Sequence, residues 1–181
     1  MSFKHLAIAT MAAFGCPGVM AYGATENFDH LPPQQITPDR PLVLDHFRVE
    51  LPIGGKAAIR PVDHDGELAS GMALGAHEDW TLSSLMLHFD QPWRRLILSL
   101  VLPPTEQPLR SLIHLYGKDP ASPAAHRTLI WHGTDRRVAR MELLRNEGES
   151  FQRVMLHLYK GAYVDNIAVE VSRDEFDLAD E

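Results

Sequence analysis

Cysteine, basic side chains and long apolar runs are all scarce in this chain. Cys16 is the only cysteine among 181 residues, which excludes an intrachain disulfide and a metal site built on a cysteine cluster. The 17 lysines and arginines are outnumbered by 24 aspartates and glutamates, and the net charge of −7 argues against a protein that coats nucleic acid. The length fits a single globular domain.

Catalytic motifs are also missing from the sequence. It has no Gly-x-Ser-x-Gly elbow, no glycine-rich phosphate loop and no His-Glu-x-x-His pair. Asp63 and Asp65 alternate ahead of a glycine, as at the start of a calcium loop, but no glutamate follows at the spacing that completes an EF-hand. We therefore expect a surface turn at these two aspartates and a protein that is not an enzyme.

The N-terminal residues have the parts of a secretory signal peptide. Lys4 gives a positive start, and residues 6–14 are almost all apolar or small. Cleavage after Gly23 would place Ala21 and Gly23 at the two small-residue positions of the cleavage site. We therefore expect residues 1–23 to be a signal peptide and the protein to be exported, to the periplasm or the cell exterior.

Two alternatives to this signal peptide remain open. Cys16 follows the apolar stretch and could carry the lipid anchor of a bacterial lipoprotein, although no leucine stands three residues before it. The same stretch could also form an ordinary buried helix. In neither case is it long enough to span a membrane, since a spanning helix needs about 20 apolar residues. No later stretch is long enough either, so we expect no membrane segment after cleavage.

Most of the remaining chain alternates apolar and polar residues with the period of two that marks a strand with one buried face. Turn residues such as Asp90-Gln91-Pro92, Pro103-Pro104 and Lys160-Gly161 separate these segments. Short strands divided by such turns predict an antiparallel β-sandwich or barrel. The segments expected to be strands are residues 43–51, 85–89, 96–102, 112–116, 128–132, 154–159 and 164–171.

The less regular parts of the chain complete the domain plan. Residues 24–41 are expected to form an extended lead-in with one strand around Phe28, residues 42–173 the sandwich, and residues 174–181 a solvated acidic tail. Apolar residues within 138–144 fit either a strand or a turn or two of helix. We favour the strand, because both neighbouring segments are strands.

Four segments resemble the galactose-binding-like jelly-roll modules of exported bacterial proteins. They are residues 87–92 (LHFDQP), the strand at 96–102, residues 112–117 (LIHLYG) and the closing residues 163–169 (YVDNIAV). The last segment, with its Asp-Asn pair between aliphatic residues, is the most specific. The resemblance implies an all-β, antiparallel two-sheet β-sandwich of jelly-roll type. It also implies a non-catalytic binding role, often for glycans.

The same resemblance implies a structural calcium ion at Asp165, near the start of the last strand. Oxygen ligands from elsewhere in the chain would complete the site, and Asn27, Asp29 and Glu170 are the candidates. The alternative is that the Asp165 carboxylate accepts hydrogen bonds from backbone amides of its own turn.

Three histidines occupy equivalent places in three expected strands. His88, His114 and His157 each stand between apolar residues that point the other way. If the strands share a sheet, the imidazoles lie on its outer face together with two methionines and two tyrosines, namely Met86, Met155, Tyr116 and Tyr159. Such rings can stack on sugars while the polar tips supply hydrogen bonds. The alternatives are a zinc or copper site, a pH switch, or side chains covered by the lead-in or a loop.

Two tryptophans extend this hypothesis. Trp80 and Trp93 stand beside expected strands, where we predict a loop rim that docks a ligand; packing in the core or at a hinge is the alternative. Taken together, the sequence predicts an exported binding module for a carbohydrate or another extracytoplasmic ligand. One alternative is a structural or assembly protein of the cell envelope or extracellular matrix, which would meet another protein through its sheet edges and acidic tail. The second is a histidine-dependent metal-binding protein.

Overall fold

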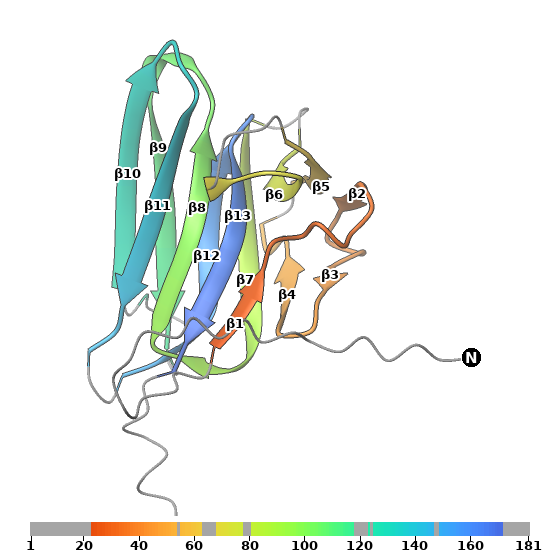
Figure 1. Ribbon diagram of the computed structural model, residues 1–181, viewed down its shortest axis with the longest axis vertical. Coiled ribbons are helices and arrows are strands. Elements are labelled where there is room, and N and C mark those ends of the chain that lie inside the picture. Colours follow the sequence, from red (N-terminus) through yellow and green to blue (C-terminus); the bar gives the residue numbers. More distant parts are fainter. Residues whose placement is uncertain are drawn as a thin grey trace, which may run out of the picture.

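A computed structural model describes residues 23–53, 55–62, 68–77, 81–117, 123, 125–146 and 149–171 (Figure 1). Within these ranges the regular elements are β-strands, and no α-helix is present. No helix among them is long and apolar enough to cross a membrane. The predicted signal peptide up to residue 22, Cys16, the Asp63–Asp65 turn and the acidic tail lie outside the described residues.

Two antiparallel sheets pack face to face (Figure 1). The seven-stranded sheet has the order β11-β8-β13-β6-β5-β2, and β1 also pairs with β13. Its strands are β1 (Gly23–Glu26), β2 (Gln34–Ile36), β5 (Ala57–Pro61), β6 (Met72–Ala76), β8 (Arg95–Leu102), β11 (Arg137–Leu144) and β13 (Tyr163–Glu170). The six-stranded sheet has the order β10-β9-β12-β7-β4-β3. Its strands are β3 (Leu42–Val43), β4 (Phe47–Glu50), β7 (Leu82–Trp93), β9 (Thr105–Tyr116), β10 (Ala125–Gly133) and β12 (Phe151–Tyr159).

This architecture confirms the predicted all-β, two-sheet sandwich of jelly-roll type. The strand interpretation of residues 138–144 is also confirmed, because β11 pairs along its full length with β8. Residues 24–41 are not separate from the sandwich, since they contain β1 and β2 of the seven-stranded sheet.

Three local predictions were wrong. The strand expected at residues 43–51 is a hairpin of two short strands, β3 and β4, that pair with each other. Phe28 is not in a strand; it lies in the turn after β1 with a φ of 61°, and its ring is fully buried. The turn expected at residues 90–92 is absent, because β7 continues to Trp93. A shift in the pairing of β12 with β7, between Phe151 and Arg153, accommodates this stretch, and Pro92 falls within it.

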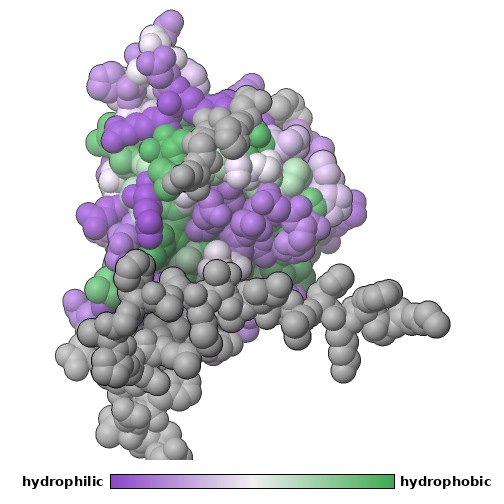
Figure 2. All heavy atoms as spheres, viewed as in Figure 1, coloured by the Kyte–Doolittle hydropathy of each residue, from purple (hydrophilic) through white to green (hydrophobic). Residues whose placement is uncertain are grey.

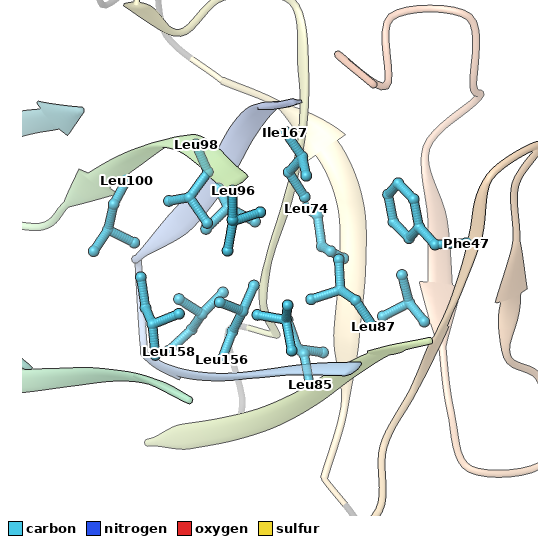
Figure 3. Packing of buried hydrophobic residues seen from close by; sticks show 14 of the residues in the cluster. Phe47, Leu74, Leu85, Leu87, Leu96, Leu98, Leu100, Leu156, Leu158 and Ile167 are labelled. Carbon is cyan, nitrogen blue, oxygen red and sulfur yellow. The ribbon is translucent and has the colours of Figure 1, made fainter. Parts of the chain in front are cut away.

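The core is the layer of aliphatic side chains between the sheets (Figure 3). Leu96, Leu98 and Leu100 of β8 point across to Leu156 and Leu158 of β12, and each of the five is at most 1% exposed. Side chains alternate between the two faces of a strand, so burial of these leucines turns their neighbours outward. The outer faces of the sheets are therefore set by the packing of the inner ones.

A bulge in β13 explains the Asp-Asn pair of the closing segment. The pairing of β13 with β8 is irregular between Asp165 and Ala168, and Asn166 has a φ of 51°. Asparagine adopts this left-handed conformation more readily than most residues. Its side-chain nitrogen also donates to the carbonyl oxygen of Leu68 at 2.9 Å, which connects the segment before β6 to β13.

The outer face of the seven-stranded sheet carries a small apolar cluster of its own. Tyr163 is buried there with Val101 and Ala73, and the guanidinium carbons of Arg60 and Arg136 lie 5.0 and 5.7 Å from the centre of its ring. Figure 2 shows this side of the molecule, where hydrophilic and apolar side chains lie next to one another. Tyr163 is therefore a packed residue of this cluster.

The alternation between core and outer face can be tested on two neighbouring residues. Leu156→Ala should lower the free energy of unfolding by about 2–5 kcal/mol, because it leaves a cavity between the sheets. Met155→Ala should change it by less than about 1 kcal/mol, because Met155 points outward and keeps solvent contact. Urea unfolding of both variants measures the two values, and equal losses would contradict the assignment of faces.

Candidate functional site

The three strand histidines lie on adjacent strands of one sheet, as the hypothesis required. β9, β12 and β7 are consecutive in the six-stranded sheet and carry His114, His157 and His88. The residues on either side of each histidine are buried in the core, so each imidazole lies on the outer face. We call this surface the histidine face; it comprises Met86, His88, Leu112, His114, Tyr116, Arg153, Met155, His157 and Tyr159.

Strand pairing arranges the histidine face in rows that cross the sheet. The central row runs from His126 of β10 through His114, Met155 and Met86 to Glu50 of β4. On one side of it is a row of Tyr116, Arg153, His88 and Arg48. On the other side is a row of Thr128, Leu112, His157 and Ser84. The face therefore combines rings, thioethers and cations.

His114 is the centre of a cluster of rings. Its centroid lies 5.5 Å from that of His157 and 6.2 Å from that of His126. The ring of Tyr116 is nearly parallel to it, at 6.3 Å and 18°. Neither Nδ1 nor Nε2 of His114 is exposed, and neither has a hydrogen-bond partner among the described residues. A buried polar group without a hydrogen-bond partner lowers the free energy of unfolding, so the imidazole of His114 destabilises the folded protein.

The imidazoles of this face are held in the neutral state. Burial lowers the pKa of His114, and the neighbouring His126 lowers it further. Burial likewise lowers the pKa of His157, with a smaller effect from His114, and Nδ1 of His157 lies 2.9 Å from the hydroxyl of Ser84. Because an ordinary histidine pKa is already near 6.5, both rings are neutral at pH 7 and each has one donor and one acceptor nitrogen.

His88 has a different environment from the other two. Its Nε2 lies 2.9 Å from a carboxylate oxygen of Glu50. Burial nevertheless keeps the pKa of His88 below its ordinary value; Glu50 opposes this effect, and the nearby Arg48 and Arg153 reinforce it. The register sets His88 two strands and one row away from His114, so these two histidines are not neighbours.

A metal site built on the three predicted histidines is therefore not supported by their positions. Within the described ranges, no group of three or more His, Cys, Asp or Glu side chains is arranged to hold a metal ion. The third histidine of the cluster around His114 is His126 and not His88. We did not single out His126 from the sequence.

Apolar side chains continue the face beyond His157. Ile130 of β10 is 62% exposed and pairs with Arg110 of β9, while Leu82 of β7 is 42% exposed and pairs with Tyr159. Tyr159, at the end of β12, packs edge-on against the buried Trp131 with centroids 6.2 Å apart. Its ring therefore lies at the border between the face and the core.

The prediction that Trp93 lies at a ligand-docking loop rim was wrong. Its side chain is fully buried in the core, because β7 extends to Trp93 and turns the indole inward opposite Phe151. Core packing, the alternative, is what the structure shows. Trp80 lies outside the described residues.

The four predicted calcium ligands do not form one group. Asn27 and Asp29 hydrogen-bond each other, and Asp29 accepts the backbone N–H of Met72 at 2.8 Å. Glu170 is elsewhere: it pairs with Arg95 at 2.8 Å and lies five residues along β13 from Asp165. At a rise of about 3.3 Å per residue it is too far to share an ion with Asp165, so its assignment was wrong.

Asp165 itself is occupied by backbone donors. Its carboxylate accepts the N–H of Ser70 at 3.1 Å and that of Asn166 at 2.7 Å. Burial raises the pKa of this carboxyl; the two hydrogen bonds oppose that effect, and Asp29 and Glu26 add to it. The bond from Asn166 is of the kind that the alternative to calcium predicted, whereas Ser70 belongs to a distant segment of the chain. Calcium binding by Asp165 with Asn27 and Asp29 stays a prediction.

Sequence reasoning missed the cations of the histidine face. Arg153 has the same phase as Met155 and His157 along one strand, so extending the alternation by one residue pair would have placed it on this surface. Arg48 has the opposite phase to the buried Phe47 and Val49. His126 was missed because its strand was expected to begin only at residue 128.

The destabilising effect of the two unpaired His114 nitrogens gives a testable prediction. His114→Leu removes the two unpaired nitrogens, so the free energy of unfolding near pH 7.5 should rise by about 1 kcal/mol. Because the folded-state pKa of His114 is depressed, the unfolded chain takes up its proton first as the pH falls below about 6.5, and wild-type stability decreases there. The variant should lose less stability than the wild type between about pH 7.5 and pH 5, as measured by urea unfolding.

The opposite result would remove this account of the residue. A variant that is less stable than the wild type near neutral pH, with an unchanged dependence on pH, would show that the imidazole is a satisfied structural group.

Among known proteins, similarity to this chain is found in solved structures. No protein-family model matches it, and no curated protein matches it. Among solved structures, it is similar to CBM29_1, a family 29 carbohydrate binding module from Piromyces equi, with 12% identity, a TM-score of 0.47, and coverage of 85% of this chain and 93% of that one.

Two further solved structures are similar at a comparable level. The K2 cleaved adhesin domain of Lys-gingipain has 9% identity and a TM-score of 0.46, with coverage of 81% of this chain and 97% of that one. The family 11 carbohydrate-binding module from Clostridium thermocellum, in complex with a β-1,3-1,4-mixed-linked tetrasaccharide, has 9% identity and a TM-score of 0.38, with 86% and 98% covered. The sandwich architecture that the sequence resemblance implied is present in this protein.

Proposed function

We propose that this protein is an exported, non-catalytic module that binds a carbohydrate on the histidine face. The observation that carries the proposal is the ring cluster around His114, in which Tyr116, His126 and His157 surround an imidazole that has no hydrogen-bond partner among the described residues. A sugar presents apolar C–H faces and a rim of hydroxyl groups, and this surface offers rings for the first and neutral imidazoles for the second.

The neutral state of the histidines suits a polyol as the ligand. Neutral imidazoles donate and accept one hydrogen bond each, so each can pair with a hydroxyl group in either direction. His157 already uses Nδ1 toward Ser84, which fixes its ring and leaves Nε2 for a ligand. A modest movement of the His114 ring on ligand binding would satisfy one of its two buried nitrogens. Binding would thereby relieve part of the destabilisation that the unpaired His114 nitrogens cause in the free protein.

Apolar side chains on the same surface could pack against the C–H faces of a sugar. Leu112 lies half-buried next to His157, and the exposed Ile130 and Leu82 continue the surface along the strands. Exposed apolar groups of this size on one sheet face favour a contact surface over a purely solvated one.

A panel of oligosaccharides tests the proposal by calorimetry, with variants chosen to separate binding from folding. Tyr116→Ala should weaken binding of the best ligand about tenfold or more, because it removes a stacking ring, while Tyr116→Phe should retain most of the affinity. His114→Leu should weaken binding although it stabilises the fold, so the loss could not be attributed to unfolding. Leu144→Ala is the control, because Leu144 is exposed on the other sheet.

Two results would contradict the proposal. One is that no oligosaccharide binds the folded wild-type protein. The other is binding that none of the variants on the histidine face alters. A stable complex with an envelope or matrix protein, formed without any glycan binding, would favour the assembly role instead.

A further inference from the structure

One row of the histidine face is strongly basic. Arg153 of β12 and Arg48 of β4 are the direct cross-strand partners of His88 on β7, so three basic side chains stand in line across three adjacent strands. Burial is the main cause of the depressed pKa of His88, and Arg48 and Arg153 add to it.

The acidic residue beside this row does not neutralise it. Glu50 serves two partners, with Arg48 at 3.0 Å and His88 at 2.9 Å. The guanidinium carbon of Arg153 lies 5.6 Å from the centre of the Tyr116 ring, and Arg153 makes no ion pair with any described residue. One carboxylate therefore faces two guanidinium groups, and Arg153 is held over a ring with no carboxylate partner in the described part of the chain.

A hollow of about 600 Å³ opens beside this row, where the histidine face meets the turn between β3 and β4. Arg48, His88 and Arg153 form part of its wall. Asp45 and Asp90 form another part, and Asp90 lies 4.0 Å from His46. The volume is within the range of sites that hold a sugar-sized ligand. The lining of the hollow thus includes donors for an anion and acceptors for hydroxyl groups.

We propose that this hollow binds the carboxylate of an acidic sugar, so that the glycan recognised by the histidine face contains uronic acid residues. The inference rests on the proposed function and names its ligand class. The planar, five-donor guanidinium groups of Arg48 and Arg153 match a carboxylate, and a charge-assisted pair of this kind is stronger than a bond between neutral groups. Arg153 lies over the Tyr116 ring and also lines the hollow, so it connects the hollow to the ring cluster.

The charge of the whole protein does not oppose this assignment. The net charge of −7 is distributed over the molecule, and at physiological ionic strength charges more than about 8 Å apart are largely screened. Glu50 is the acidic group nearest to the row and is paired with Arg48 and His88. Asp45 and Asp90 also line the hollow and can accept hydrogen bonds from sugar hydroxyl groups. Arg153, which has no carboxylate partner in the described part of the chain, is the group that we expect to bind the acidic substituent.

The test compares acidic oligosaccharides with their own neutral forms. Tetramers of galacturonate, glucuronate and mannuronate, each alongside its methyl ester, are titrated into the purified protein at low salt. We expect at least one acid to bind about tenfold or more tightly than its ester, with a preference that decreases on addition of salt. Arg153→Gln should remove most of that preference, because it weakens binding of the acid much more than binding of the ester, and Arg48→Gln should act in the same direction.

Arg140→Gln provides the matched control, because Arg140 is an exposed arginine on β11 of the other sheet. Esters that bind as well as their acids, or an Arg153 variant that behaves like the Arg140 variant, would overturn the inference and leave the proposed function standing. If none of the acids or esters binds while a neutral glycan does, the inference is likewise overturned. If no glycan of any kind binds, both proposals fail.

Discussion

The packing of aliphatic side chains between the two sheets is the constraint on which the rest of the structure depends. Leu85, Ile113 and Leu156 must face inward to form the core, and a strand has only two faces. The residues between such positions are thereby fixed outward, in rows set by the strand register. The histidine face is thus a consequence of core packing. A slip of one residue in β12 would bury His157 and expose Leu156, which the core does not permit.

The pattern that builds the core also made much of the fold predictable. Alternation predicted β8 and β12 closely, and the neighbouring strands resolved residues 138–144 in favour of a strand. Alternation failed at residues 90–92, where Asp-Gln-Pro has turn chemistry but lies in a strand that an irregular pairing accommodates. It also gave no warning of β5 and β6, which are short and contain small residues such as Ala73 and Gly75. Tertiary pairing, which no local pattern records, determines both cases.

The candidate site was predictable as a face but not as a geometry. Phase placed His88, His114 and His157 on one surface, yet only the sheet order shows that His88 stands with two arginines and that His126 replaces it beside His114. The error at Trp93 has the same origin, because a residue beside a supposed turn was expected at a rim and is buried in a continuing strand. Neutral imidazoles in one part of the face and cations in another give it two distinct chemistries.

The most direct test of the account uses the methionine methyl groups as reporters of where a glycan binds. Met86 and Met155 lie in the central row of the histidine face, whereas Met72 and Met141 belong to the other sheet. In a methyl NMR titration with a glycan that binds, the account predicts shifts of the Met86 and Met155 signals and little change at Met72 and Met141. Shifts confined to Met72 and Met141 would contradict it.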